Sequence, residues 1–228
     1  MDEILNRVRT MAHVQCENLD DKMAVYSNWS ESYEEDVFAL KYTAPHQAVK
    51  MLYDVIDNYK LEENCDIIDF AAGTGLVGKC LREKGFTGSV DGQDGCDAML
   101  RRAKQYRNTF CCILEPGAKL PVELTSNSYD VATISGALSP SQVDVDCIPI
   151  IIGAVRLGGY IVLTTRLNPS NLQYVERLES EMKRLELEDV WVSLSKRRIE
   201  EFELATDDSE KVNDSKYIPG VVYCFQKL

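Results

Sequence analysis

From Cys65 onward, short apolar runs alternate with segments of helical length, and this alternation constrains the fold more than any other feature of the sequence. Apolar runs of strand length occupy residues 66–70, 89–94, 109–114, 129–135 and 160–165, and helical patterns occupy residues 76–84, 97–106 and 147–157. Strands that alternate with helices in this way form a parallel sheet whose two faces are covered by helices. The alternation therefore predicts an α/β fold.

The C-terminal quarter departs from this rhythm. After an amphipathic helical pattern at residues 172–185, two long apolar runs at 191–204 and 221–228 follow with no helical segment between them, so we expect an antiparallel pair. The prediction is thus a Rossmann-like, doubly wound, mostly parallel seven-stranded sheet that ends in an antiparallel β-hairpin. The acidic loop between these two runs, which holds Asp207, Asp208, Glu210 and Asp214, is expected to be a solvent-exposed tip, and a partner-binding loop is the alternative.

The first 60 residues have a helical pattern, with Val49, Leu52 and Val55 on one apolar stripe. The chain contains no internal repeat and no Pro/Gly/Ser-rich linker. We therefore expect a single domain over residues 1–228, in which residues 1–60 form N-terminal helices and a lid and residues 65–228 form the Rossmann-like core. The stretch before Tyr26 lacks a strong apolar stripe, so we expect it to become ordered when a cofactor binds.

Composition excludes several classes of function. The 25 Lys and Arg residues against 37 Asp and Glu residues give a net charge of −12, which disfavours nucleic-acid partners. The chain has only two histidines and no C-x-x-C pair among its eight cysteines, so we expect no metal site and reduced thiols in a cytoplasmic protein. No apolar run approaches the ~20 residues that cross a bilayer, so we expect no membrane partner.

A glycine-rich segment lies between the first expected strand and helix. Gly73, Gly75 and Gly78 satisfy G-x-G-x-x-G, a pattern typical of dinucleotide binding. However, Asp69 closes the strand directly before the loop, and no arginine nearby compensates it. At ~5 Å and an effective dielectric near 20, each negative charge of a pyrophosphate costs about 3 kcal/mol against this carboxylate. The loop therefore favours a cationic or neutral ligand, and S-adenosylmethionine, with its sulfonium and ammonium groups, fits.

A second carboxylate lies at the end of the second expected strand. Asp94 follows Gly75 by 19 positions, where a carboxylate can accept hydrogen bonds from both hydroxyls of a ribose. Asp91 is the alternative. Asp94 is favoured because Gly95 and Asp97 follow it, which indicates that it ends the strand. A helix-capping or turn role is the other reading of Asp94.

These segments resemble those of class I S-adenosylmethionine-dependent methyltransferases. The resemblance is carried by Asp69-Phe-Ala-Ala-Gly-Thr-Gly75 and by Asp94-Gly-Cys-Asp-Ala-Met-Leu100. Three further stretches look like the Williams–Beuren-region methyltransferase-like proteins: residues 26–37, Ser135-Gly-Ala-Leu-Ser139 with Gln142, and residues 163–174. The resemblance covers roughly residues 15 to 185 and implies S-adenosylmethionine as cofactor and S-adenosylhomocysteine as product.

The resemblance also implies a set of cofactor-binding residues. The glycine loop should lie under the methionyl group, Asp94 should hold the ribose, and Tyr33 should belong to the lid, although amphipathic helix packing is the alternative for Tyr33 and core packing is the alternative for Met99. The adenine contact falls to the turn after the third strand. The predicted cofactor-binding residues are Tyr33, Asp69, Ala71, Gly73, Gly75, Asp94, Gly95, Met99, Glu115, Gly117, Ser135 and Gly136.

Methyl transfer needs orientation of two reactants and exclusion of water more than it needs an acid or a base. No catalytic residue is therefore predicted. The acceptor, a small molecule or a protein side chain, should lie near residues 135–138. Arg166 either holds an acceptor carboxylate or pairs with one of the many surface acidic residues.

Two other functions remain open at this stage. The G-x-G-x-x-G pattern allows an NAD-dependent oxidoreductase, although no Tyr-x-x-x-Lys pair follows the fourth strand. The lack of a clear catalytic group allows a non-catalytic protein that binds S-adenosylmethionine or stabilises a partner. The oligomeric state is undetermined, with a monomer slightly favoured.

Overall fold

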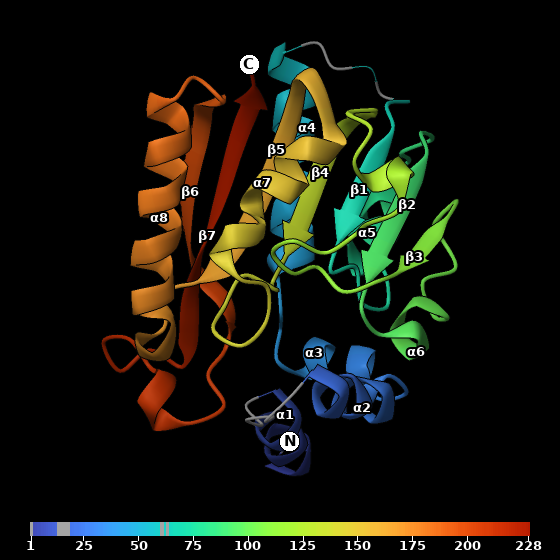
Figure 1. The fold of residues 1–228 in the computed structure, drawn as a ribbon. Helices are drawn as coiled ribbons and strands as arrows, with labels where there is room; N and C mark the ends of the chain where they lie inside the picture. Colours follow the sequence, from blue (N-terminus) through green and yellow to red (C-terminus); the bar gives the residue numbers. More distant parts are fainter. Residues whose placement is uncertain (1, 13–18, 60–61, 63) are drawn as a thin grey trace.

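The computed structural model describes residues 2–12, 19–59, 62 and 64–228 (Figure 1). Its centre is a seven-stranded sheet in the order β3-β2-β1-β4-β5-β7-β6, in which β7 runs antiparallel to β5 and β6 and the other neighbouring pairs are parallel. This arrangement confirms the predicted fold class. The strands are β1 (Ile67–Phe70), β2 (Val90–Asp94), β3 (Thr109–Cys111), β4 (Tyr129–Ser135), β5 (Val155–Arg166), β6 (Trp191–Leu204) and β7 (Tyr217–Lys227).

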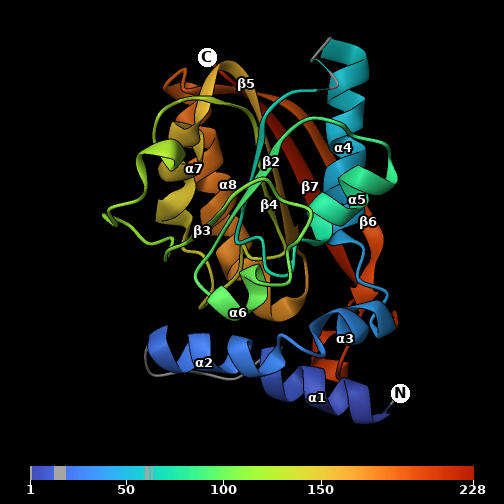
Figure 2. The same cartoon turned by 90° about the vertical axis from the view of Figure 1, so that its right-hand side faces the viewer.

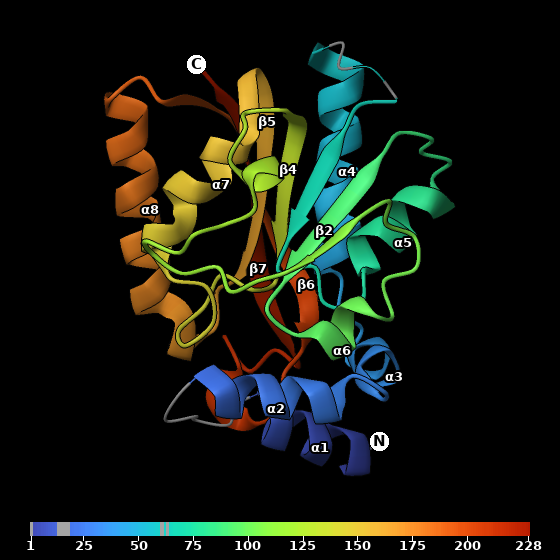
Figure 3. The same cartoon turned by 45° about the vertical axis from the view of Figure 1, so that its right-hand side comes forward.

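Helices cover both faces of the sheet (Figure 3). The helices are α1 (Asp2–Ala12), α2 (Leu19–Trp29), α3 (Tyr33–Ala39), α4 (Ala44–Tyr59), α5 (Leu76–Glu83), α6 (Asp97–Leu100), α7 (Ile148–Ala154) and α8 (Leu172–Leu187). One apolar core joins α7 and α8 to one face, and a second core joins α4 and α5 to the other. Ile67, Ile68 and Phe70 of β1 are fully buried, which explains why this short strand is apolar at every position except Asp69.

The N-terminal helices α1, α2 and α3 lie across the carboxyl ends of the parallel strands (Figure 2). Two backbone hydrogen bonds tie the segment after α3 to the end of β6. The Leu204 N–H donates to the Leu40 carbonyl at 2.8 Å, and the Thr43 N–H donates to the Phe202 carbonyl at 2.9 Å. The carboxyl ends of the strands are where ligands bind in open α/β sheets, so these helices lie over the expected site.

Several predicted boundaries need correction. The helix predicted at residues 97–106 ends at Leu100, because Gln105 and Tyr106 fold back onto the glycine loop. The helix predicted at 147–157 ends at Ala154, because Val155 already pairs with Tyr129 in the sheet. The third strand stops at Cys111 rather than at residue 114, and the last strand begins at Tyr217 rather than at Val221.

Part of the stretch before Tyr26, residues 13–18, lies outside the described residues, and the ordering expected there stays a prediction. Within the described part of the chain, no helix combines the length and the apolar character that crossing a membrane requires.

Candidate functional site

A cavity of about 300 Å³ lies between the N-terminal helices and the carboxyl ends of the strands. Its wall combines residues of α1, α2 and α3 with the loops after β1 to β4, the ends of β5 and β6, and the loop before β7. A smaller cavity adjoins it and shares five of its residues, Tyr33, Tyr42, Ala71, Gly73 and Ser135. The position fits the rule that α/β proteins bind their ligands at this edge of the sheet.

The glycine loop forms the floor that the two cavities share. Ala71, Gly73 and Gly75 all have left-handed backbone conformations, with φ of 50°, 55° and 86°. Gly73 lines both cavities, and a Cβ on Gly73 would meet no other atom within 4 Å. The turn therefore favours glycine at position 73 because of its positive φ, and the backbone of Gly73 is open to a ligand.

Gly75 and Gly78 have a different role from the one predicted. Neither glycine lines either cavity, because the segment after α6 packs against them. A Cβ on Gly75 would overlap the Gln105 side chain, whose Nε2 donates to the Gly75 carbonyl, and a Cβ on Gly78 would overlap Tyr106. These two glycines therefore allow close packing behind the loop rather than close approach to a ligand.

Asp94 is the carboxylate at the end of β2 that faces the main cavity. Its Oδ2 accepts a hydrogen bond from the Gly73 N–H and its Oδ1 accepts one from the Cys96 N–H, both at 2.8 Å. Burial raises the pKa of Asp94, and the backbone N–H donors offset only part of that rise. The side chain is thus held rigidly against the glycine loop, with its remaining lone pairs available to a ligand.

Asp91, the alternative considered from the sequence, lies elsewhere. Its two oxygens accept hydrogen bonds from Arg107 at 2.9 and 2.8 Å, and Oδ2 also accepts one from the Tyr129 hydroxyl at 2.8 Å. Burial acts to raise the pKa of Asp91, but the hydrogen bonds from Arg107 and Tyr129 outweigh it and lower that pKa. Asp91 lines neither cavity, so the structure favours Asp94 over Asp91 as a ligand-facing acid.

Asp69 lies behind the loop, on the wall of the smaller cavity. Its side chain is 1% exposed and accepts hydrogen bonds from the Thr133 hydroxyl at 2.6 Å and the Tyr106 hydroxyl at 2.5 Å. Burial raises the pKa of Asp69 to about 7. Because the group is partly protonated near neutral pH, it repels a pyrophosphate less than the sequence argument assumed. The carboxylate that faces the main cavity is that of Asp94.

An aromatic group also lines the main cavity. Tyr26 and Trp29 stack with their ring centroids 6.1 Å apart, and the Tyr33 ring meets Trp29 edge-on at 4.9 Å. The Gln142 amide donates to the Tyr26 hydroxyl at 3.0 Å. Tyr42 packs on Gly136, where a Cβ would overlap its hydroxyl. The expected lid residue Tyr33 is therefore in the cavity wall together with three aromatic neighbours.

Two buried carboxylates and an arginine lie near these rings in the cavity wall. Glu203 of β6 pairs with Arg166 at the end of β5, with 2.9 Å between Glu203 Oε1 and Arg166 Nε. Glu210 is 5% exposed, and its Oε2 accepts hydrogen bonds from the N–H and hydroxyl of Thr206, each at 2.9 Å. All three residues line the cavity.

The prediction of a solvent-exposed acidic tip is therefore wrong for Glu210. A 3₁₀ turn at Asp208–Glu210 brings that side chain back to the sheet edge, while Asp208 and Asp214 remain exposed. Arg166 does pair with an acidic residue, as one of its two readings had it, but that residue is buried in the cavity wall.

The two cavities bring together ten of the twelve predicted residues. These are Tyr33, Asp69, Ala71, Gly73, Asp94, Gly95, Met99, Glu115, Ser135 and Gly136. Gly75 and Gly117 line neither cavity. The sequence analysis did not single out Tyr42, Glu203 or Glu210 as site residues. They come from segments that the backbone hydrogen bonds between residues 40–43 and β6 join, and no local motif marks that contact.

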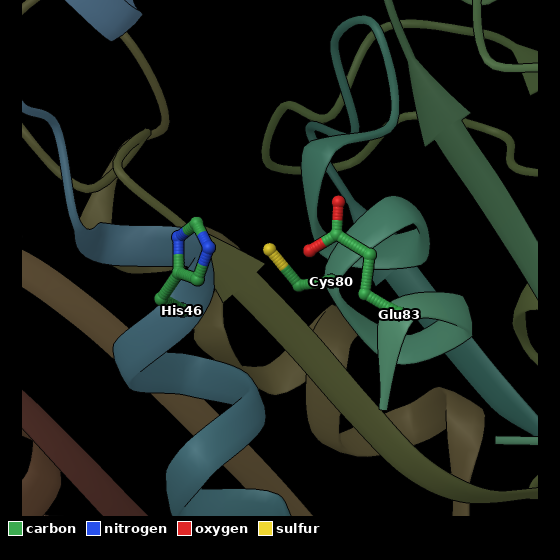
Figure 4. A group of neighbouring side chains, drawn as sticks. All are labelled: His46, Cys80 and Glu83. Carbon is green, nitrogen blue, oxygen red and sulfur yellow. The ribbon is translucent and has the colours of Figure 1, made fainter. Parts of the chain in front are cut away.

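One group of donor atoms suited to a metal ion also occurs among the described residues (Figure 4). His46 of α4 faces Cys80 and Glu83 of α5, and their ligand atoms lie within 4.8 Å of one another. Burial raises the pKa of the Cys80 thiol to about 11, so the thiol is protonated at neutral pH. None of the three residues lines either cavity.

Comparisons with known proteins agree with this geometry. The chain is 36% identical over 197 residues to methyltransferase-like protein 27 of Homo sapiens. The match covers 85% of this chain and 77% of the human protein. No protein-family model matches the sequence.

Solved structures share the fold at low sequence identity. A complex of the Haloferax volcanii Trm112 methyltransferase activator with a methyltransferase contains a chain with a TM-score of 0.59 and 13% identity, and the match covers 89% of this chain and 97% of that one. An S-adenosylmethionine-dependent methyltransferase from Geobacter sulfurreducens in complex with S-adenosylhomocysteine has a TM-score of 0.53 and 14% identity, with coverage of 80% and 91%.

Proposed function

Since the chain belongs to the class I S-adenosylmethionine-dependent methyltransferases, together with methyltransferase-like protein 27, we propose that it binds S-adenosylmethionine in the main cavity and methylates a small molecule or a protein side chain there. The observation that carries the proposal is the pairing of Asp94 with Gly73 across the cavity floor. This hydrogen bond holds the Asp94 carboxylate beside the open backbone of Gly73. A nucleoside that carries an amino-acid group needs both: the carboxylate for its ribose and the open backbone for the amino-acid group.

The residues present fit this cofactor. Asp94 would accept hydrogen bonds from the ribose hydroxyls, Ala71 and Gly73 would lie under the methionyl group, and Met99 and Glu115 would flank the adenine. The cofactor supplies the reactive methyl group, attached to a positively charged sulfur. The carboxylates of the wall suit that charge, because Asp94, Glu115, Asp144, Glu203 and Glu210 outnumber its two basic residues, Lys22 and Arg166.

The remaining contribution of the chain is orientation and shielding. Helices α1, α2 and α3 contribute residues to the cavity wall and lie across the carboxyl ends of the strands (Figure 2), where they would keep water from the reacting groups. Tyr42 and Ser135 lie beside Gly136, at the end of β4, where the acceptor is expected. No residue is assigned as a catalytic acid or base.

Calorimetric titration with S-adenosylmethionine, S-adenosylhomocysteine and NAD tests the proposal. We expect the first two to bind with similar affinity, because the ribose, adenine and amino-acid contacts survive the loss of the methyl group. NAD should show no saturable binding, because its pyrophosphate would lie among the carboxylates of the wall. NAD binding in place of S-adenosylmethionine would contradict the proposal. Binding of the cofactor in the titration, together with no methyl transfer to any acceptor in a separate activity assay, would favour the non-catalytic alternative.

The affinity for S-adenosylmethionine is expected to rise from pH 6 to pH 8 by roughly three- to tenfold. The pKa of Asp69 is about 7, above its ordinary value near 4, so the folded protein holds this proton in the window between about pH 4 and 7 and loses stability as pH rises through it. A cationic methionyl group nearby lowers that pKa, so binding releases the proton and is favoured at higher pH.

Titrations of the wild type, Asp69→Asn and Asp97→Asn at several pH values measure this effect. Asp69→Asn should bind with an affinity that no longer changes over this range, whereas Asp97→Asn, a substitution on the exposed face of α6, should behave as wild type. An unchanged pH dependence in Asp69→Asn would assign the proton to another group.

We further propose that residues 1–228 act as one domain and as a monomer, in a reducing compartment such as the cytoplasm. The two cores lie on opposite faces of the same sheet, which supports a single folding unit. Among the described residues, the large exposed apolar side chains are spread over several elements, and only Leu172 and Leu187 share one, α8: Phe38, Val122, Leu157, Leu172, Leu187 and Leu228. The seven described cysteines are all free thiols, which supports a reducing environment.

A further inference from the structure

We propose that His46, Cys80 and Glu83 bind one Zn²⁺ ion, and that this ion joins α4 to α5 at a site separate from the two cavities. The proposed methyl transfer does not use these residues, so the inference goes beyond the proposed function. From the sequence we expected no metal site, because the chain has only two histidines and no C-x-x-C pair. The contact between the two helices, which no local motif marks, brings the three donor residues together (Figure 4).

The three side chains form one group because of their positions on the two helices. Cys80 and Glu83 lie three positions apart on α5, where side chains are neighbours on the helix surface. His46 lies in the first turn of α4, which shares an apolar core with α5. In Figure 4 the Cys80 sulfur points toward the His46 imidazole, and the Glu83 carboxylate lies on the other side of the sulfur. One ligand atom of each residue lies within 4.8 Å of the other two.

These separations are close to those of a zinc centre. Bonds of about 2.3 Å to sulfur and about 2.0–2.2 Å to nitrogen and oxygen place the ligand atoms of a tetrahedral centre about 3.5 Å apart. The ion would therefore have to draw the three atoms together by little more than about 1 Å. His46 and Glu83 are exposed and can rotate about their side-chain bonds to make this adjustment, whereas Cys80 is buried and stays in place.

The donor set selects the class of ion. A thiolate, an imidazole and a carboxylate are the ligands that Zn²⁺ takes, and three protein ligands leave the fourth tetrahedral position to water. Water can reach that position because His46 and Glu83 lie at the surface. Mg²⁺ and Ca²⁺ are bound by oxygen atoms and gain little from sulfur or imidazole nitrogen. The group therefore favours zinc over these two ions.

The surroundings of the group also favour a cation. Among the described residues, none forms a hydrogen bond or an ion pair with the side chain of His46 or Glu83. Two basic residues near Cys80 on α5 are bound elsewhere. Lys79 pairs with Glu34 of α3, and Arg82 Nη1 donates to two backbone carbonyls at 2.7 and 2.9 Å. The donor atoms are thus not engaged by other described side chains.

Binding of the ion would release the proton of the Cys80 thiol. Burial, and after it the negative charge of Glu83, raises the pKa of this thiol to about 11, so the sulfur carries a proton before the ion binds. A divalent ion reverses this preference, because a thiol that coordinates such an ion is deprotonated. The S–H bond breaks, its electron pair forms the bond from sulfur to zinc, and the proton passes to water. No oxidant or reductant is needed.

The ion would hold together two helices that border the smaller cavity. Pro45, which precedes His46, lines that cavity together with Leu76 and Val77 in the first turn of α5. The three ligands are close together only when both helices are in place, so the ion should bind the folded chain in preference to the unfolded chain. Zinc should therefore raise the urea concentration at the midpoint of unfolding.

Titration of the full chain with Zn²⁺ tests the proposal. Protein freed of metal by dialysis against a chelator, and kept reduced, competes for zinc with a chromophoric indicator. We expect one ion per chain, and excess Mg²⁺ should not displace it. His46→Gln and Glu83→Gln should each weaken zinc binding by at least about tenfold, since even the loss of a ligand's hydrogen-bond partner costs roughly 10- to 100-fold. Both side chains are exposed, so these variants should keep the fold.

Two matched controls and a spectroscopic probe locate the ligands. Glu123→Gln removes an exposed carboxylate and Cys111→Ser removes an exposed thiol, and neither should change the zinc affinity. Co²⁺, which takes the same ligands, should give the ultraviolet absorption band of a cobalt–thiolate bond. The band should be present in wild type and Cys111→Ser and absent from Cys80→Ala.

Three results would overturn the inference. These are no stoichiometric zinc binding, wild-type zinc affinity in His46→Gln and Glu83→Gln, or a cobalt–thiolate band that persists in Cys80→Ala. The two exposed variants decide the test whether or not Cys80→Ala folds. A zinc-bound protein that unfolds at the same urea concentration as the metal-free protein would overturn the joining of α4 to α5.

Discussion

Replacement of Asp36 by alanine is expected to lower the free energy of unfolding by about 3 kcal/mol. The Asp36 carboxylate is fully buried, and Arg7 Nε lies 3.1 Å from its Oδ1 and 2.9 Å from its Oδ2. The Trp29 indole N–H also donates to Oδ2 at 2.7 Å. Removal of the carboxylate takes away the acceptor of the buried indole N–H and the closest counter-charge of the partly buried Arg7 guanidinium, and unmet buried donors are costly.

The same substitution should weaken cofactor binding, because this one carboxylate joins three helices. Arg7 belongs to α1, Trp29 to α2 and Asp36 to α3. These helices lie across the carboxyl ends of the strands (Figure 2) and contribute residues to the cavity wall. Without this shared carboxylate, α1, α2 and α3 are no longer fixed relative to one another. Trp29 and Tyr33 then no longer hold their positions in the cavity wall. We therefore expect reduced affinity for S-adenosylmethionine as well as reduced stability.

Urea unfolding and calorimetric titration measure the two effects of Asp36→Ala. Glu35→Ala is the matched control, because Glu35 also lies near Arg7, at 3.7 Å, but its side chain is 72% exposed. An exposed ion pair contributes little, so the control should lie within about 0.5 kcal/mol of wild type. If Asp36→Ala unfolds at the same urea concentration as Glu35→Ala, the buried network does not hold the helices.

Acid should reveal the same network. Burial acts to raise the pKa of Asp36, but its hydrogen bonds to Arg7 and Trp29 lower it below the ordinary value. A carboxyl group whose folded pKa is lowered stabilises the fold above its unfolded pKa, near 4, and this contribution is lost as pH falls through the folded value. The stability difference between wild type and Asp36→Ala should therefore shrink in acid.

The central sheet was predictable from the sequence because its strands are buried on both faces. The runs at β1 and β4 are rich in buried apolar residues, and their predicted bounds agree with the structure to within one residue. The antiparallel pair β6 and β7 was predictable because no helical segment separates the two runs. In each case the pattern depends on local burial, which a single sequence records directly.

The part of the cavity wall formed by Arg166, Glu203 and Glu210 was not predictable, because long-range contacts build it. Glu203 and Glu210 lie in the last 30 residues, and they reach the cavity because Leu204 and Phe202 bond to the segment after α3. A loop that buries one glutamate can have the same composition as an acidic loop that is wholly exposed to solvent, so the sequence does not reveal that Glu210 is buried. The glycine motif misled in the opposite direction, since Gly75 and Gly78 match a ligand-binding pattern but serve to pack Gln105 and Tyr106.

Substitution of Asp94 by asparagine is expected to weaken binding of S-adenosylmethionine by roughly 10- to 100-fold. Hydrogen bonds from two ribose hydroxyls to a carboxylate are charge-assisted, and an amide cannot accept both in the same geometry. The stability of the fold should change by no more than about 1 kcal/mol, because two effects oppose each other. Asparagine loses one of the hydrogen bonds from Gly73 and Cys96, but it also removes a buried charge whose pKa is raised.

A comparison of Asp94→Asn with Asp91→Asn separates binding from folding. Asp91 lies on the same strand but pairs with Arg107 and Tyr129 outside the cavities, so Asp91→Asn should lower stability while leaving cofactor affinity near wild type. The two carboxylates would thus show opposite effects in calorimetry and in urea unfolding. Wild-type affinity in Asp94→Asn, or weakened affinity in Asp91→Asn alone, would move the ribose contact to the other acid and with it the orientation of the cofactor in the cavity.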